Sequence, residues 1–176
     1  GVGRFCYAAA KTGWQVRGID ASERAVEIGR SSADLLLSTE TLDDLFEAGE
    51  KFDFVCTFEV LEHLDDPVSF LKSTKRLMKP GSELFITTPN WDSTLIQTAT
   101  KMSWVPPIHK LFFTKQSIKA LIEEAEFNNP IVELSWTDPK PFGKFAQAYW
   151  IMRRLLGARF GFHSHDIGLW AKVTAN

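Results

Sequence analysis

Hydrophobic and polar positions follow two different periods along the first 90 residues. Four short apolar runs, rich in β-branched, aromatic and leucine side chains, predict β-strands at residues 14–19, 35–37, 54–58 and 84–88. Between these runs, apolar residues recur three and four positions apart, as on one face of a helix. This second period predicts helices at residues 5–12, 21–30, 42–48 and 68–78.

Strands that alternate with helices predict an α/β fold, a Rossmann-like, doubly wound and mostly parallel sheet with right-handed crossovers. Beyond residue 113 the pattern predicts two more helices and two more strands, at 115–126, 131–136, 142–156 and 167–173. The last two strands would form an antiparallel pair at the edge of the sheet. The length suits one core, so we expect a single domain over residues 1–176.

The alternation lapses between residues 91 and 113. This stretch holds Trp91, Trp104, Phe112 and Phe113 together with two prolines, and it follows neither period. A long aromatic loop without a period is typical of a lid or a substrate-binding insertion. Ordinary loop packing is the alternative.

Composition narrows the class of protein. The chain is 44% hydrophobic and 12% aromatic, which is typical of a soluble globular domain, and it has no apolar run long enough to form a transmembrane helix. Its two cysteines, Cys6 and Cys56, lack metal-site spacing, and we expect reduced thiols in a cytoplasmic protein. Residues 1–66 carry six basic and 14 acidic side chains, which argues against a broad nucleic-acid surface. The pattern does not indicate an oligomeric state.

Chemistry is expected just after the strand at 54–58. Glu59, Glu62 and His63 follow it at spacings of three and four, so a helix there would place all three side chains on one face. That face would lie at the carboxyl end of a central strand, where open α/β sheets bind ligands.

Asp20 directly follows the first predicted strand, at 14–19, and has two interpretations. It can cap the helix that follows, with Glu23 completing a capping box, or it can accept hydrogen bonds from both hydroxyls of a ribose. The glycines at Gly1 and Gly3 open the first helix, where backbone amides can approach a ligand.

Five blocks together resemble a class I S-adenosylmethionine-dependent methyltransferase, most closely the ubiquinone-biosynthesis O-methyltransferase branch. They are GVGRF at 1–5, VRGID at 16–20, FDFVCTFEVLEHLDDP at 52–67, RLMKPGSELFITTPN at 76–90 and LFFTKQSIKALIEEAEF at 111–127. In that family the glycine motif begins earlier and follows a first strand, which this sequence lacks. The resemblance therefore predicts a fragment whose sheet has a gap between the strands ending at Asp20 and at Glu59.

The resemblance also implies a cofactor site for S-adenosyl-L-methionine. Gly1 and Gly3 would let the backbone approach its methionyl part, Asp20 would hold the ribose, Ala21 would lie against adenine, and Phe58 would pack at the same pocket.

The implied reaction is methyl transfer to a small molecule, most naturally at a hydroxyl, with His63 as the base, either directly or through Glu62. The alternative for His63 is that it caps or packs against its own helix. The implied alternatives for the whole protein are an inactive cofactor-binding module and an enzyme that methylates the 3′-terminal 2′-hydroxyl of RNA. The RNA alternative is weakened because the loop lacks a dense basic run between its aromatic residues.

A metal site is a further hypothesis. Small-RNA methyltransferases of the same superfamily bind a divalent ion through two glutamates and two histidines in a similar arrangement, here Glu59, Glu62, His63 and His109. Such a set suits Mn²⁺ better than Mg²⁺. In many other relatives the same glutamates only border the cofactor pocket, so both interpretations stay open.

Overall fold

The computed structural model describes residues 1–32, 35–93, 107–134 and 168–175. The described residues fall into two compact units. The first unit runs from Gly1 to Asp44, and the second begins at Leu45.

The first unit pairs two short parallel strands with two helices. Helix α1 (Arg4–Lys11) leads to β1 (Arg17–Ile19), and α2 (Glu23–Ser32) leads to β2 (Leu36–Ser38). The strands pair in register at Gly18 and Leu37. Gly13 follows α1 with a φ of 91°, a conformation that favours glycine, so the predicted helix end is confirmed. The first predicted strand is shorter than expected, because only its last three residues pair. Helix α3 (Leu42–Glu47) then leads along the chain into the second unit.

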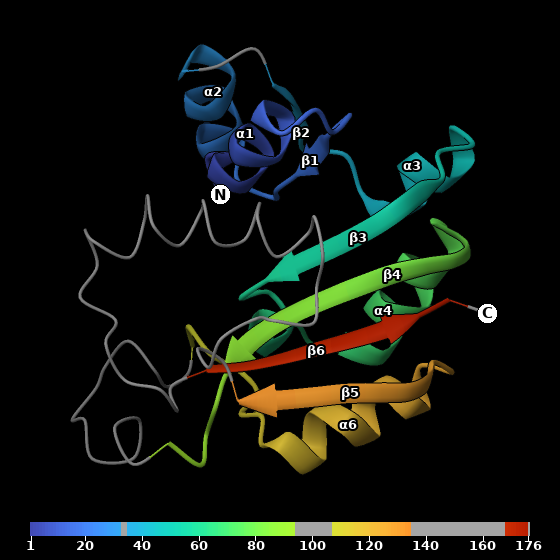
Figure 1. The fold of residues 1–176 in the computed structure, drawn as a ribbon. Helices are drawn as coiled ribbons and strands as arrows, with labels where there is room; N and C mark the ends of the chain where they lie inside the picture. The colour runs from blue at the N-terminus through green and yellow to red at the C-terminus, as the bar shows by residue number, and fades with distance from the viewer. Residues whose placement is uncertain (33–34, 94–106, 135–167, 176) are drawn as a thin grey trace. The chain divides into compact units, whose positions relative to one another are not determined.

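The second unit is a four-stranded sheet with helices (Figure 1). Its elements in chain order are β3 (Phe52–Phe58), the 3-10 turn η1 (Leu61–His63), α4 (Pro67–Arg76), β4 (Met78–Pro89), α6 (Lys115–Glu124), β5 (Asn128–Leu134) and β6 (Gly168–Thr174). The strand order is β3-β4-β6-β5. β3 and β4 are parallel, whereas β6 is antiparallel to both of its neighbours.

The antiparallel final strand is thus confirmed, but its predicted place was wrong. β6 inserts between β4 and β5 instead of forming an edge pair with β5, so β5 becomes the outer strand. A strand in this position gains hydrogen bonds on both sides, which an edge strand does not. The predicted helix at 142–156 lies outside the described residues.

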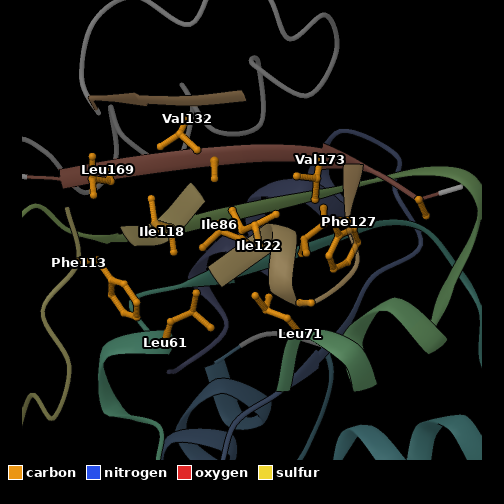
Figure 2. Close-up of a cluster of buried hydrophobic side chains, with 14 of the residues drawn as sticks. Leu61, Leu71, Ile86, Phe113, Ile118, Ile122, Phe127, Val132, Leu169 and Val173 are labelled. Carbon is orange, nitrogen blue, oxygen red and sulfur yellow. The ribbon is translucent and has the colours of Figure 1, made fainter. Parts of the chain in front are cut away.

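A hydrophobic core lies between one face of this sheet and helices α4 and α6 (Figure 2). Every second residue of the central strands faces it, and α6 contributes residues four positions apart. Each of the following side chains is at most 2% exposed: Leu84 and Ile86 of β4, Leu169, Ala171 and Val173 of β6, Ile118 and Ile122 of α6, and Leu71 of α4.

Two element boundaries differ from the prediction at the junction of α4 and β4. The helix ends at Arg76, and β4 already begins at Met78, which pairs with Phe52. The register then shifts, so that Phe54 pairs with Glu83. Residues 79–81, which directly follow the predicted helix at 68–78, form an irregularity within β4 in which Gly81 has a φ of 77°.

Helix α6 begins where the sequence predicts. Thr114 caps it through a capping box with Ser117, and the helix ends at Glu124, two residues before the expected position. In the described ranges, no helix is long and apolar enough to cross a membrane.

The two sheets are separate hydrogen-bonded units. Among the described residues, β1 pairs only with β2, and β3 pairs only with β4.

Candidate functional site

Asp20 lies at the carboxyl end of β1, where its backbone N–H donates to the Ser38 carbonyl at 3.0 Å. Its Oδ1 accepts the Ser22 N–H at 2.9 Å. Burial raises the pKa of Asp20, whereas the hydrogen bond from the Ser22 N–H lowers it. The residue presents its carboxylate at the end of a strand.

The capping interpretation of Asp20 was wrong. Helix α2 begins at Glu23, so Ser22 occupies the capping position, and the Ala25 N–H donates to its hydroxyl at 3.3 Å. Asp20 instead closes a turn onto Ser22, which leaves the expected capping box with Glu23 unformed.

The two glycines of the first block have different surroundings. Gly3 has a φ of 72°, a conformation that favours glycine, and a Cβ there would lie 2.7 Å from a methyl carbon of Leu37. A Cβ at Gly1 would meet no described atom within 4 Å. Ala21, which follows Asp20, is exposed.

Phe58 ends β3 in the second unit, where its ring packs against that of Phe85 with the ring centroids 6.1 Å apart. Its place at the cofactor stays a prediction, as do the cofactor roles of Gly1, Gly3, Asp20 and Ala21.

Both ends of the predicted lid are anchored. Asn90 forms a parallel bridge with Phe113, and the Trp91 N–H donates to the Phe113 carbonyl at 2.8 Å. The Trp91 and Phe112 rings lie 4.4 Å apart. Residues 94–106 lie outside the described residues, so the lid itself stays a prediction.

Glu59 does not share a face with Glu62 and His63, contrary to the prediction. It has a left-handed backbone, with a φ of 52°, and the helical turn begins only at Leu61. Its carboxylate accepts the Thr87 hydroxyl at 2.8 Å. The carboxylate is open to water on one side, yet surrounding protein and the charge of Glu62 raise its pKa to about 7.

Glu62 is the most buried charged residue of the site, at 1% exposed. Its Oε2 accepts the Thr88 hydroxyl at 3.0 Å, whereas Oε1 is buried and has no hydrogen-bond partner among the described residues. Burial raises the pKa of its carboxyl. Its backbone carbonyl accepts N–H bonds from Lys110 and Leu111, at 2.8 and 3.1 Å, which fixes the segment carrying His109 on η1.

His63 is exposed, and its ring has a defined orientation. Nδ1 lies 2.6 Å from the Ile108 carbonyl, which can only accept a hydrogen bond, so the Nδ1 nitrogen carries the proton. Nε2 is then the basic nitrogen of the neutral ring, and it lies 3.9 Å from Oε1 of Glu62.

His109 completes a cluster with these two residues. Its ring meets that of His63 edge to face, with centroids 4.8 Å apart. Burial, and then repulsion by His63, lower the pKa of His109, which favours a neutral imidazole. One ligand atom from each of Glu62, His63 and His109 lies within 4.8 Å of the others, and Glu59 is outside the group.

The arrangement combines a base with a donor set for a cation. A neutral imidazole nitrogen beside an unpaired carboxylate oxygen can accept a proton, and the same atoms with His109 can bind a divalent ion. Sequence reasoning missed Thr87, Thr88 and the Ile108 carbonyl. The paired threonines at a strand end were the available signal, but their partners come from another element.

A model of the methyltransferase domain matches residues 1–130. The chain is 34% identical over 116 residues to the ubiquinone biosynthesis O-methyltransferase of Brucella ovis, covering 60% of this chain and 47% of that protein. It therefore spans about half the length of that relative.

Two solved structures share the fold. A SAM-dependent methyltransferase from Archaeoglobus fulgidus matches 99% of this chain and 82% of its own, with a TM-score of 0.69 at 17% identity. The plantazolicin methyltransferase BamL, solved in complex with a triazolic desmethylPZN analog and SAH, matches all of this chain and 74% of its own, with a TM-score of 0.71 at 13% identity. With the strand-end carboxylate and the five sequence blocks, these matches show that the chain belongs to the class I S-adenosylmethionine-dependent methyltransferases.

Proposed function

We propose that this protein transfers the methyl group of S-adenosyl-L-methionine to a hydroxyl group of a small molecule, with His63 as the base. The observation that carries the proposal is the fixed His63 ring, whose proton is bound by the Ile108 carbonyl while Nε2 stays basic. The choice of a hydroxyl acceptor is supported by the similarity of the chain to the ubiquinone biosynthesis O-methyltransferase of Brucella ovis.

The residues of the first unit fit the cofactor. The strand-end carboxylate at Asp20, whose Oδ1 is held by the Ser22 N–H, suits a ribose diol. Ala21 would lie against the adenine. When bound, the cofactor would supply an electrophilic methyl group, which would pass from its sulfonium sulfur to the acceptor oxygen and leave S-adenosylhomocysteine as the second product.

His63 and Glu62 divide the proton chemistry. Nε2 of His63 would take the proton of the acceptor hydroxyl, which makes the ring an imidazolium. Oε1 of Glu62, at 3.9 Å, would stabilise that positive charge. The Ile108 carbonyl keeps the ring oriented throughout.

A second candidate mechanism uses a divalent metal. The buried, unpaired oxygen of Glu62 and the imidazoles of His63 and His109 form a donor set that suits Mn²⁺, and the ion would lower the pKa of the acceptor hydroxyl. Glu59 as a further ligand stays a prediction. His63 would then be a ligand instead of the base, which makes the two mechanisms separable.

Two other functions remain as outcomes of the test. A protein that binds cofactor without transfer would be an inactive module, and one that methylates only RNA would be a 2′-hydroxyl RNA methyltransferase. The small-molecule acceptor is favoured because the acidic first part of the chain repels RNA.

The experiment is calorimetric titration of S-adenosylhomocysteine, followed by methyl transfer to 3,4-dihydroxybenzoate as a probe acceptor. We expect Asp20→Asn to weaken binding about 10-fold or more, the effect of a lost charged hydrogen bond. The control is Glu23→Gln, which removes the charge of an exposed carboxylate three residues after Asp20. A folded protein that binds no S-adenosylhomocysteine contradicts the proposal.

The base and metal mechanisms differ in their response to Mn²⁺. If His63 is the base, His63→Ala lowers transfer about 100-fold or more, and neither Mn²⁺ nor a chelator changes the rate. If the metal acts, a chelator abolishes transfer, and His109→Ala weakens Mn²⁺ binding. If the His63→Ala variant transfers methyl groups at the wild-type rate, both the base mechanism and the metal mechanism are excluded.

A further inference from the structure

Two consecutive threonines at the end of β4 hold the two glutamates of the site on opposite faces of the sheet. The Thr87 hydroxyl donates to Glu59 at 2.8 Å, and the Thr88 hydroxyl donates to Glu62 at 3.0 Å. Successive side chains of a strand point to opposite faces. Thr88 therefore shares the core face with Leu84 and Ile86, which explains its exposure of only 1%.

The Thr88 contact determines which atom of Glu62 faces the cluster. The hydroxyl occupies Oε2, so the carboxylate is held by one oxygen and the other, Oε1, is left 3.9 Å from Nε2 of His63. Oε1 is buried and unpaired among the described residues. A buried carboxylate oxygen without a donor is costly, and such groups are retained where a charge is needed.

Among the residues that the structure describes, Glu62 has no second side-chain hydrogen-bond donor that could replace Thr88. Its backbone carbonyl is occupied by the N–H groups of Lys110 and Leu111. In the part of the chain that the structure describes, Thr88 is the only side chain that donates a hydrogen bond to the carboxylate, and the backbone N–H of Glu62 itself also interacts with it. Without that hydroxyl, the carboxylate could rotate away from His63 or take up a proton.

We infer that Thr88 is a positioning residue for the site, because its hydroxyl anchors one oxygen of Glu62 so that the other faces His63 and His109. The inference rests on the proposed function of that cluster. It applies to both mechanisms, since the oriented oxygen stabilises a positive charge that is either an imidazolium or a metal ion. Thr88 itself touches neither substrate nor cofactor in this role.

The test compares Thr88→Val, which keeps the shape and removes the hydroxyl, with Thr88→Ser, which keeps the hydroxyl. We expect Thr88→Val to lower kcat for methyl transfer to 3,4-dihydroxybenzoate about 10- to 100-fold with little change in KM, the usual effect of losing a group that orients a ligand or base. Thr88→Ser should restore kcat to within about threefold of the wild type.

The matched control is Thr74→Val. Thr74 is equally buried at 1% exposed, but its hydroxyl donates to the Phe70 carbonyl within α4, so this change tests only the loss of a buried hydroxyl. Its kcat should equal that of the wild type. Equal losses in Thr74→Val and Thr88→Val would show a general packing effect and overturn the inference.

A spectroscopic readout separates this inference from the proposed function. In protein labelled with ¹⁵N-histidine, the His63 Nε2 signal should shift in Thr88→Val and return in Thr88→Ser, whereas S-adenosylhomocysteine affinity should stay within about twofold in both. An unmoved His63 signal in a folded Thr88→Val protein overturns the inference even if the enzyme is inactive on the probe.

If the wild-type protein does not bind S-adenosylhomocysteine, that result contradicts the proposed function and not the role of Thr88.

If Thr88→Val does not fold, Thr88→Cys takes its place, because a thiol is a weaker donor of similar shape. The His63 Nε2 signal should then move further from its wild-type position in Thr88→Cys than in Thr88→Ser. Equal changes of the signal in the two variants overturn the inference.

Discussion

The left-handed backbone of Glu59 separates two carboxylates that are only three residues apart. With a φ of 52°, Glu59 directs its side chain to Thr87, while the turn that follows places Glu62 on the core side at Thr88. Non-glycine residues in this conformation are uncommon and are found at functional sites more often than elsewhere. One backbone angle thus decides which acid joins the two histidines.

Glu59 should make stability depend on pH near neutrality. Its pKa of about 7 in the folded protein exceeds the ordinary value of 4.5, so between these values the folded state holds the proton more tightly. The free energy of unfolding should therefore fall as the pH rises from 4.5 to 7, and the loss should be complete above 7. The full shift corresponds to about 3 kcal/mol, and we expect about 1 kcal/mol because water reaches the exposed carboxylate.

The measurement is urea denaturation of the wild type and of Glu59→Gln at pH 4.5 and pH 8. Glu59→Gln should be more stable than the wild type by about 1 kcal/mol at pH 8 and equal to it at pH 4.5. Glu47→Gln, on the exposed side of α3, is the control. A difference that is the same at both pH values would contradict the prediction.

Among the helices, α6 shows how a short motif places a whole element. The Thr114 hydroxyl accepts the Ser117 N–H at 3.1 Å, and the Ser117 hydroxyl accepts the Thr114 N–H at 2.8 Å. This start orients the helix so that Ile118 and Ile122 face the core. The same threonine follows directly on Phe113, which anchors the far end of the predicted lid.

Removing the cap should weaken the second unit without altering the site residues. We expect Thr114→Ala to lower the free energy of unfolding by about 1 kcal/mol, and Thr114→Ser to lower it much less because serine also caps well. Chemical denaturation followed by circular dichroism measures both. Equal losses for alanine and serine would mean that the methyl group, and not the hydroxyl, matters.

At the scale of the whole molecule, the two units differ in how their strands are supported. In the second unit, β4 is paired on both sides and contributes Leu84 and Ile86 to the core. In the first, β1 and β2 pair over only three residues, and Leu36 is 59% exposed. Local stability increases with the number of buried contacts and backbone hydrogen bonds. The free energy of local unfolding should therefore be higher for the sheet of the second unit than for that of the first.

Hydrogen exchange followed by mass spectrometry should detect this difference. We expect the amides of residues 83–88 to exchange about 10-fold or more slowly than those of residues 17–19. Adding S-adenosylhomocysteine should slow exchange around Asp20, because a ligand that binds only the folded state stabilises it. Equal protection of the two sheets without ligand would contradict the prediction.

The sequence by itself determined the elements and several of their ends. Hydrophobic periods of 2 and 3.6 are local, and so are the cap at Thr114 and the glycine at Gly13, so these features could be read without a fold. The residue types of the site were also evident, because two acids and a histidine directly follow a buried strand. Strand boundaries were less accurate, since pairing with a partner decides where a strand begins.

Only the tertiary structure decided which of these residues meet. β6 enters the sheet between β4 and β5, His63 binds the carbonyl of Ile108, 45 residues away, and Glu62 finds its donor in Thr88, 26 residues away. Such pairings depend on how distant elements pack, and no local period encodes them. For the same reason, the sequence placed Glu59 with the cluster, whereas its backbone conformation and the two-sided geometry of β4 keep it apart.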